Sequence, residues 1–281
     1  MEKISDIKIL TEEELKNWLK EVGEKPFRAD QIRNRLFCGQ VKSFDAMETI
    51  PAALREKLSA NFRITSLEEA KRLLSEDGTV KWLYRTHDGY HIETVLIPTN
   101  DRFSVCVSTQ IGCAQNCAFC RTAKMGFIRN LEAGEILEEI IRVNWYLEET
   151  GTKHSDGSLA KVTNIIFMGM GEPLNNLEQV HRVCCTLHHQ KLFNLGRKRM
   201  TISTSGVVPK IKELVDRNTP CCLAVSLNST NDERRSAVMP VNKVWNIAKL
   251  LQATDEYTKR TGNYVTFEFV LMKGITCSEE A

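Results

Sequence analysis

The chain has 281 residues, of which 42% are hydrophobic and 26% are charged, and this globular composition excludes a disordered protein. The 38 basic and 36 acidic residues leave a net charge of +2, too small for overall charge to indicate a polyanionic partner. No apolar run is long enough to span a bilayer, and the start at Met1 opens no secretory signal, so we expect a reducing cytoplasm and no membrane association.

Residues 1–62 are predicted to form a small accessory domain of three short helices. Thr11 and Glu14 form a capping box at the start of the first helix. The second helix covers residues 31–37, and the third begins near Pro51.

Residues 63–98 change to the composition of strands and are predicted to form a hairpin that links two domains. The stretches 80–84 and 90–97 are rich in β-branched and aromatic residues. Asp-Gly pairs ending at Gly78 and Gly89 supply the turns before them.

From residue 99 to residue 281 strands and helices alternate, which indicates an α/β domain built of parallel units. The predicted strands cover 104–108, 162–168, 200–205, 222–227 and 265–271, and the predicted helices cover 135–147, 177–189, 210–216 and 244–257. Five units are too few for a closed eight-stranded barrel, so we expect a partial, open β/α barrel that is incomplete at its C-terminus. Its functional residues should lie at the carboxyl ends of the strands.

Three cysteines, Cys113, Cys117 and Cys120, form a C-x3-C-x2-C triplet just after the first of these strands. A cluster held by three thiolates keeps one iron open to a small molecule, because Fe–S clusters normally take four cysteines. A structural zinc site would require a fourth ligand nearby, and the next histidine, His154, is distant. A disulfide framework fits poorly with ten cysteines in 281 residues and no signal peptide.

Small polar residues follow the later strands. Gly171 lets the backbone approach a ligand, and Glu172 can accept a hydrogen bond from an ammonium group. Ser203 and the segment 226–228 offer further hydrogen-bonding groups. The alternative interpretation is structural, with a glycine in a turn and serines that cap helices.

Taken together, these motifs resemble those of the dual-specificity RNA adenine-C2 methyltransferases of the radical S-adenosylmethionine (SAM) superfamily, over nearly the whole chain. The matching segments are Lys25 to Ala29, Glu93-Thr94-Val95, Gly112-Cys113-Ala114 with Cys117 and Cys120, Gly126-Phe127, Arg129-Asn130-Leu131, Met168 to Leu174, Ser203 to Pro209, Ser226-Leu227, Asp232-Glu233 and Pro240. The resemblance implies methylation of C2 of an adenine in 23S ribosomal RNA and in transfer RNA. It also implies a [4Fe–4S] cluster and SAM as cofactors.

The resemblance assigns roles to particular residues. The cluster ligands would be Cys113, Cys117 and Cys120, and the SAM-binding residues would be Gly171, Glu172, Ser203, Ser226, Leu227 and Asn228. Glu93 would be the proton acceptor, and Cys106 would resolve a protein–RNA adduct by forming a disulfide. From the residues alone, Cys106 would be interpreted as a small buried side chain in a strand and Glu93 as an exposed strand residue, and only the resemblance favours the functional roles.

In this family the reaction proceeds through a methylated cysteine in a later carboxyl-terminal segment. The chain ends at Ala281 before such a segment, and Cys277 lacks its sequence context. We therefore expect a truncated chain that binds the cluster but does not complete methyl transfer. A monomer and an electron donor such as a flavodoxin or ferredoxin are also expected.

Two basic clusters are candidates for RNA contact. One lies in the helical domain, at Lys25, Arg28, Arg33 and Arg35, and the other comprises Lys191 with Arg197-Lys198-Arg199. Charge runs of this kind are also common on solvated surfaces. Two other functions stay open: a radical SAM enzyme with a different substrate, and a non-catalytic Fe–S or RNA-binding remnant.

Overall fold

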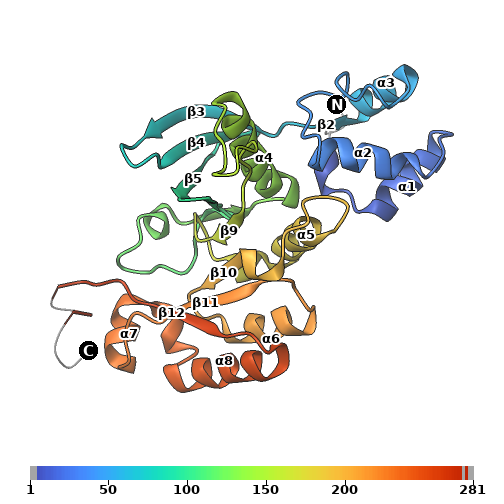
Figure 1. Ribbon diagram of the computed structural model, residues 1–281. Coiled ribbons are helices and arrows are strands. Elements are labelled where there is room, and N and C mark those ends of the chain that lie inside the picture. The colour runs from blue at the N-terminus through green and yellow to red at the C-terminus, as the bar shows by residue number, and fades with distance from the viewer. Residues whose placement is uncertain (1–4, 274–275, 278–281) are drawn as a thin grey trace.

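The amino-terminal part of the chain is a bundle of three helices. The computed structural model describes residues 5–273 and 276–277, and within it α1 covers Glu12–Glu21, α2 Arg28–Phe37 and α3 Ala52–Asn61 (Figure 1). The predicted capping box is present, with the Thr11 hydroxyl accepting from the Glu14 backbone and the Glu14 carboxylate accepting from the Thr11 backbone. All three predicted helices are confirmed.

A buried group of charged residues joins this bundle to the rest of the molecule. The first strand, β1 (Ser5–Asp6), pairs in parallel with β2 (Phe62–Arg63) and closes the bundle on itself. The ammonium of Lys8 lies 2.8 Å from Asp6 and 3.2 Å from Glu138, and all three side chains are buried. Buried ion pairs require close partners, so this group fixes the bundle against the helix that carries Glu138.

In the described part of the chain after the bundle, eight strands form one sheet in the order β12-β11-β10-β9-β6-β5-β4-β3. The strands are β3 (Leu67–Leu74), β4 (Val80–Thr86), β5 (His91–Thr99), β6 (Arg102–Cys106), β9 (Asn164–Phe167), β10 (Met200–Thr204), β11 (Cys222–Ser226) and β12 (Val265–Glu268). Neighbours from β6 to β12 are parallel, and those from β3 to β6 are antiparallel. The carboxyl ends of the five parallel strands therefore share one edge.

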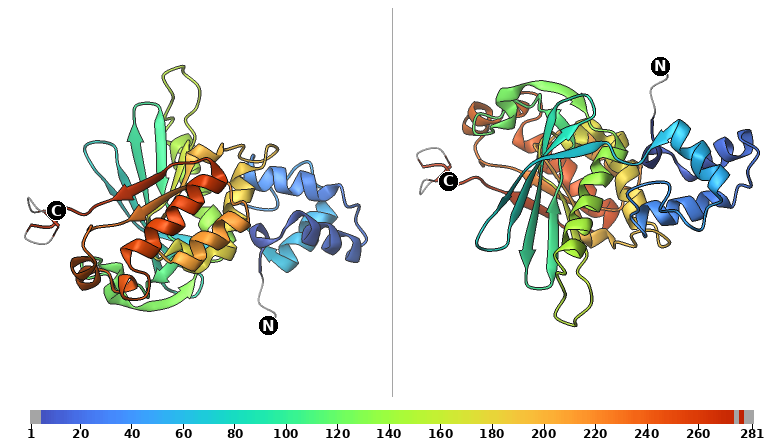
Figure 2. Two further views of the ribbon diagram at one scale, coloured as in Figure 1. Left: turned by 90° about the horizontal axis from the view of Figure 1, so that it is seen from below. Right: turned by 90° about the horizontal axis from the view of Figure 1, so that it is seen from above.

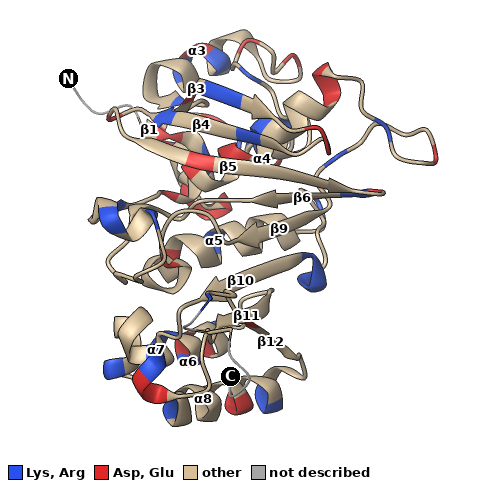
Figure 3. Cartoon of the chain, turned by 90° about the vertical axis from the view of Figure 1, so that its left-hand side faces the viewer, with Lys and Arg blue, Asp and Glu red and all other residues tan. Residues whose placement is uncertain are grey.

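Helices cover one face of the sheet and leave the other open (Figures 2 and 3). The covering helices are α4 (Ala133–Glu149), α5 (Leu177–His188), α6 (Val208–Asp216) and α8 (Ile247–Thr261). Short 3-10 helices cover Ile7–Ile9, Thr122–Met125, Pro173–Asn176, Arg197–Arg199 and Pro240–Lys243. The sheet is open and curved, which confirms the expected α/β partial barrel. Among the described residues, no helix is both long and apolar enough to traverse a membrane.

The strands of residues 63–98 do more than form a separate hairpin. A strand that was not predicted, β3, pairs with β4, and β5 pairs with β6, so the antiparallel strands extend the barrel sheet. The short helix α7 (Asp232–Val238) was not predicted either. Strand β3 has only one buried residue, Leu67, and therefore lacks the alternation that identifies strands in a sequence.

Candidate active site

The three cysteines of the triplet lie on one hairpin loop. Two short strands, β7 (Gln110–Gly112) and β8 (Phe127–Asn130), pair in antiparallel fashion, and the loop between them carries Cys113, Cys117 and Cys120. All three thiols are free of disulfides. Because the hairpin follows β6 directly, it projects from the carboxyl edge of the parallel strands.

The backbone of this loop is held from two sides. The Cys113 amide donates to the Gly126 carbonyl at 3.0 Å, and the Ala118 amide donates to the Val238 carbonyl of α7 at 2.9 Å. Figure 2 shows the loop beside α7. At the base of the hairpin, Gly112 has φ +72°, and a Cβ there would lie 1.7 Å from the Gly126 oxygen. Only glycine fits this crossing of the two strands.

One cavity of about 290 Å³ brings the hairpin loop together with the ends of the parallel strands. Its walls include Cys113, Cys117, Cys120, Gly171, Glu172, Ser203, Ser226, Met168 and Glu268. Seven of the predicted site residues therefore meet in one place, although they come from four separate stretches of the sequence. Polar groups converging on a cavity at the carboxyl ends of parallel strands are typical of a small-molecule site.

Glu172 is buried, lines the cavity and accepts several hydrogen bonds. Its Oε2 accepts from the backbone and hydroxyl of Ser205, at 2.8 and 2.7 Å, and its Oε1 accepts from the Leu174 amide at 3.1 Å. Burial raises the pKa of this carboxyl, while the bonds from Ser205 and Leu174 lower it. The adjacent Gly171 has φ +104°, and a Cβ there would lie 2.6 Å from Gln110. The turn thus packs directly on the base of the cysteine hairpin.

A second carboxylate in the cavity was missed in the sequence. The hydroxyl of Ser203 donates to Glu268 Oε2 at 2.7 Å, and that of Ser226 lies 3.4 Å from the same oxygen. Glu268 ends β12 and is in register with Ser226 on β11. The predicted strand ran from 265 to 271 and placed Glu268 in its middle, whereas the observed strand ends at Glu268, so no strand-end signal in the sequence marked this residue.

Two predicted residues lie beside the cavity and do not line it. The Leu227 amide donates to the Glu268 carbonyl at 3.0 Å, and its side chain is buried. Asn228 has φ +57°, its Oδ1 accepts from the Val270 amide at 2.8 Å, and its amide nitrogen contacts the Met239 sulfur. These contacts shape the loop after β11.

Glu93 and Cys106 lie on the open face of the sheet. Glu93 forms an ion pair of 2.8 Å with Lys81 of β4, and its side chain is 42% exposed. Cys106 pairs in register with Val95 of β5, two residues beyond Glu93. A hydrogen bond from the Met168 backbone reaches the Cys106 sulfur, which places this thiol beside a residue that lines the cavity.

Burial raises the pKa of the Cys106 thiol to about 11. Relative to a cysteine at the ordinary value of 9.0, we expect about a hundredfold less thiolate at neutral pH and correspondingly slow alkylation by iodoacetamide. Mass spectrometry of the labelled apo chain between pH 7 and pH 11 measures this rate, with the exposed Cys277 as the internal comparison. A Cys106 rate that levels off near neutral pH would contradict the expectation.

Behind the sheet, α4 buries Glu139 without a countercharge. Its Oε2 accepts from the Thr94 hydroxyl and the Ser108 amide, whereas its Oε1 has no hydrogen-bond partner in the described structure. Burial raises the pKa of this carboxyl well above its usual range. Above the ordinary carboxyl pKa, we therefore expect the folded protein to keep a proton that the unfolded chain releases.

We expect Glu139→Gln to remove a pH dependence of stability. As the pH rises above the ordinary carboxyl pKa, the unfolded chain loses its proton while the folded chain retains it, so the free energy of unfolding falls. The glutamine variant should lack this decline. Urea unfolding of the apo chain from pH 5 to pH 8 measures it, and the exposed Glu148→Gln on the same helix should behave as the wild type. If the free energy of unfolding depended on pH in the same way in both variants, Glu139 would not be the source of the decline.

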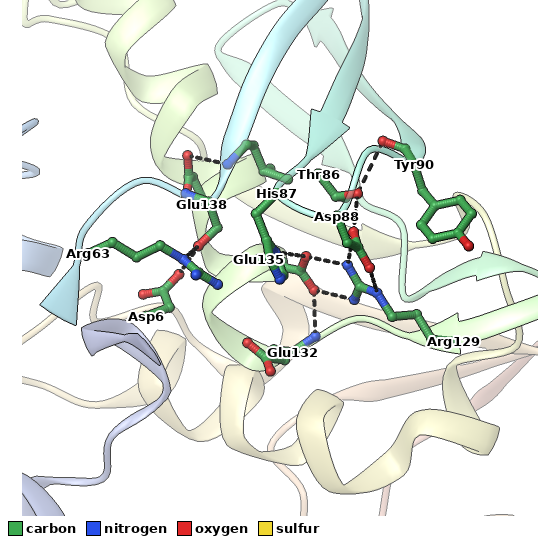
Figure 4. Close-up of polar contacts among 12 residues, drawn as sticks. Asp6, Arg63, Thr86, His87, Asp88, Tyr90, Arg129, Glu132, Glu135 and Glu138 are labelled. Carbon is green, nitrogen blue, oxygen red and sulfur yellow. Dashed lines mark hydrogen bonds and ion pairs between the residues drawn. The ribbon is translucent and has the colours of Figure 1, made fainter. Parts of the chain in front are cut away.

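Arg129 connects the base of the hairpin to two other elements (Figure 4). Its guanidinium donates to both carboxylate oxygens of Asp88, at 2.7 and 2.9 Å, and to both of Glu135, at 2.8 Å each. Asp88 lies in the turn between β4 and β5, and Glu135 is completely buried in the first turn of α4. Doubly bidentate contacts of this kind fix both position and orientation of the strand β8.

Comparisons with known proteins show the family of this chain. The model of the radical SAM superfamily matches residues 107–280, and that of the ribosomal RNA large subunit methyltransferase N-terminal domain matches residues 6–64. The probable dual-specificity RNA methyltransferase RlmN of Bacillus pumilus is 43% identical over 93% of this chain and 71% of its own length. The RlmN of Anaeromyxobacter dehalogenans is 42% identical over 98% of this chain and 73% of its own length.

A solved structure is also similar. A radical SAM methyltransferase from Sphaerobacter thermophilus superposes with a TM-score of 0.91 and 39% identity, covering 98% of this chain and 79% of that one. The open barrel with its three-cysteine loop is thus that of a radical SAM protein. Within this superfamily, the chain belongs to the RlmN family of dual-specificity RNA methyltransferases.

Proposed function

We propose that the protein to which this chain belongs is a radical SAM methyltransferase that acts on C2 of an adenine in 23S ribosomal RNA and in transfer RNA. The observation that carries the proposal is the single cavity lined by the three cysteine thiols and by polar residues from four strand ends. Membership of the RlmN family supports the reaction type and the RNA substrate. Adenine C2 lies between two ring nitrogens, so radical chemistry suits it better than polar attack.

The donor set fits a [4Fe–4S] cluster better than a single metal ion. Cys113, Cys117 and Cys120 line the same cavity, and their sulfurs interact electrostatically with one another. Three neighbouring thiolates on one loop are the ligands that such a cluster takes, one for each of three irons. When bound, such a cluster supplies the electron that cleaves SAM to an adenosyl radical.

The other residues of the cavity offer complementary groups for SAM. Glu172 presents a carboxylate that can accept from the ammonium of the methionine moiety, and Gly171 leaves room for that moiety beside the backbone. Ser203, Ser226 and Glu268 can exchange hydrogen bonds with hydroxyl or carboxylate groups. Leu227 and Asn228 would contribute through the backbone of their loop.

Glu93 and Cys106 are proposed to act on the RNA base. Both lie on the open face of the sheet, where a base extruded from folded RNA has access. Glu93 would accept the proton, with Lys81 holding its carboxylate in place. Cys106 would resolve the adduct by forming a disulfide, and it is unpaired in the structure.

The domain division 1–62, 63–98 and 99–281 is kept as part of the proposal, with the helical bundle as the RNA-binding part. In that bundle Lys25 is exposed, and the Arg28 guanidinium stacks over the exposed ring of Phe27 at 5.0 Å. Arg33 and Arg35 instead bond backbone carbonyls of the protein. A flavodoxin or ferredoxin as electron donor, a monomeric state and a cytoplasmic location stay predictions.

Deletion of the gene tests the function in the cell. We expect 2-methyladenosine to disappear from digests of both 23S ribosomal RNA and transfer RNA, and to return when the gene is supplied again. Unchanged 2-methyladenosine in both RNAs would overturn the proposed substrate. In vitro, the anaerobically reconstituted and reduced chain should release 5′-deoxyadenosine from SAM, and an iron-loaded chain that leaves SAM intact would overturn the radical SAM activity.

A further inference from the structure

A fully buried arginine, Arg235, lies behind the cavity, and no carboxylate among the described residues bonds to it. It belongs to α7, and its relative exposure is 0%. None of its hydrogen bonds goes to a carboxylate, and no acid of the described structure forms an ion pair with it. The carboxylate of Asp232 interacts with Arg235 only electrostatically and accepts hydrogen bonds from Asn242 and from the Ile247 amide instead. A buried charge without a countercharge is unfavourable, so it requires an explanation.

The guanidinium holds the ends of two strands of the site. It donates to the Ser205 carbonyl at 2.7 Å after β10, and to the Ser226 and Leu227 carbonyls at 3.2 and 2.9 Å at the end of β11. A fourth bond reaches the Asn242 amide oxygen at 2.8 Å. The five N–H donors of the planar guanidinium, here called the fork, can bond these four acceptors at once. An ammonium has only three donors and cannot.

The same helix packs against the cysteine loop. The Ala118 amide donates to the Val238 carbonyl at 2.9 Å, and Val238 and Met239 pack against Cys117. The charge of Arg235 interacts electrostatically with the Cys117 sulfur. This cation, which no carboxylate of the described residues contacts directly, therefore lies within electrostatic range of one proposed cluster ligand.

We propose that Arg235 is a positioning residue whose charge compensates the cluster held by Cys113, Cys117 and Cys120, while its fork sets the strand ends that receive SAM. This inference rests on the proposed cluster site. Three thiolates outweigh the positive charge of a [4Fe–4S] core, so the site is anionic, and it becomes more so when the core gains an electron. A neighbouring cation stabilises the reduced form and raises the reduction potential.

Two substitutions separate the charge from the fork. Arg235→Lys keeps the charge and loses the fork, whereas Arg235→Gln keeps hydrogen-bond donors and loses the charge. The matched control is Arg217→Met, which removes one positive charge just after α6, at the opposite edge of the sheet. The reconstituted chains are compared by EPR-monitored redox titration of the cluster and by the dissociation constant of SAM, and the apo chains by thermal unfolding.

We expect a lower cluster potential in Arg235→Gln and a wild-type potential in both Arg235→Lys and Arg217→Met. Both variants at position 235 should weaken SAM binding about tenfold or more, as is typical when a residue that supports the ligands is lost. A wild-type potential in Arg235→Gln, or equal shifts in the glutamine and lysine variants, would overturn the role of the charge.

Loss of the cluster is decisive as well. If Arg235→Gln folds as an apo chain but takes up no iron while Arg235→Lys does, the charge is required; if both fail alike, the arginine is only structural and the inference is overturned. A wild-type chain that forms no cluster would refute the proposed function itself.

Discussion

Gly112→Ala is expected to prevent the cysteine hairpin from forming. The new Cβ would lie 1.7 Å from the Gly126 oxygen, so β7 and β8 would have to separate. A left-handed backbone position alone costs about 1–3 kcal/mol for alanine, and the clash adds to this, so we expect about 3 kcal/mol or more of lost stability. Urea unfolding of the apo chain and iron uptake on anaerobic reconstitution measure the two effects, and uptake should fall to background.

Gly151→Ala is the matched control for this substitution. Gly151 also has a positive φ, +63°, but a Cβ added there would meet no atom within 4 Å, and the residue follows α4 away from the hairpin. Alanine there should cost only the backbone strain, about 1–2 kcal/mol, and leave iron uptake unchanged. Equal losses of iron uptake in the two variants would show that the clash at Gly112 is not the cause.

Arg129→Met is expected to release the hairpin from α4 and from the β4–β5 turn. The substitution leaves the completely buried Glu135 without its guanidinium partner, and breaking a buried pair in this way costs about 3–5 kcal/mol. The free energy of unfolding from urea titration should fall by this amount. Because β8 carries one side of the cysteine loop, iron uptake should fall with it.

The comparison for Arg129 is an exposed pair of the same chemistry. A guanidinium nitrogen of Arg85 lies 2.6 Å from the Glu68 Oε2, and the two side chains are 53% and 67% exposed. Such surface pairs contribute about 0.2–1 kcal/mol, so Arg85→Met should be nearly neutral. A loss at Arg129 no larger than that at Arg85 would mean that the buried network does not support the hairpin.

Much of the site was predictable because the chain repeats one arrangement. Each parallel strand ends at the same edge, so Glu172, Ser203 and Ser226 could be placed near the cysteines from their positions after apolar runs. The three cysteines lie within one short loop, so their proximity could be predicted from their spacing in the sequence alone. The proximity of these residues follows from the order and approximate positions of the strands, so an error of a few residues at a strand end does not change the prediction.

Contacts between distant segments were not predictable in this way. Nothing in the sequence distinguishes Arg235 from other basic residues. Only the fold brings its guanidinium within hydrogen-bond distance of the Ser205 and Leu227 carbonyls. The basic run at Arg197–Arg199 was a candidate RNA surface, but it directly precedes β10 and so lies at the edge opposite the cysteine loop. The charge of a sequence segment does not show at which edge of the sheet that segment lies.

The bond between Ala118 and Val238 has a consequence for biosynthesis. The two residues are 120 positions apart, 238 minus 118. At roughly 5–20 residues per second of translation, on the order of ten seconds pass between their emergence. During that interval the three thiols of the nascent polypeptide lack the cover of α7, so they are open both to iron delivery and to oxidation before the enclosure is complete.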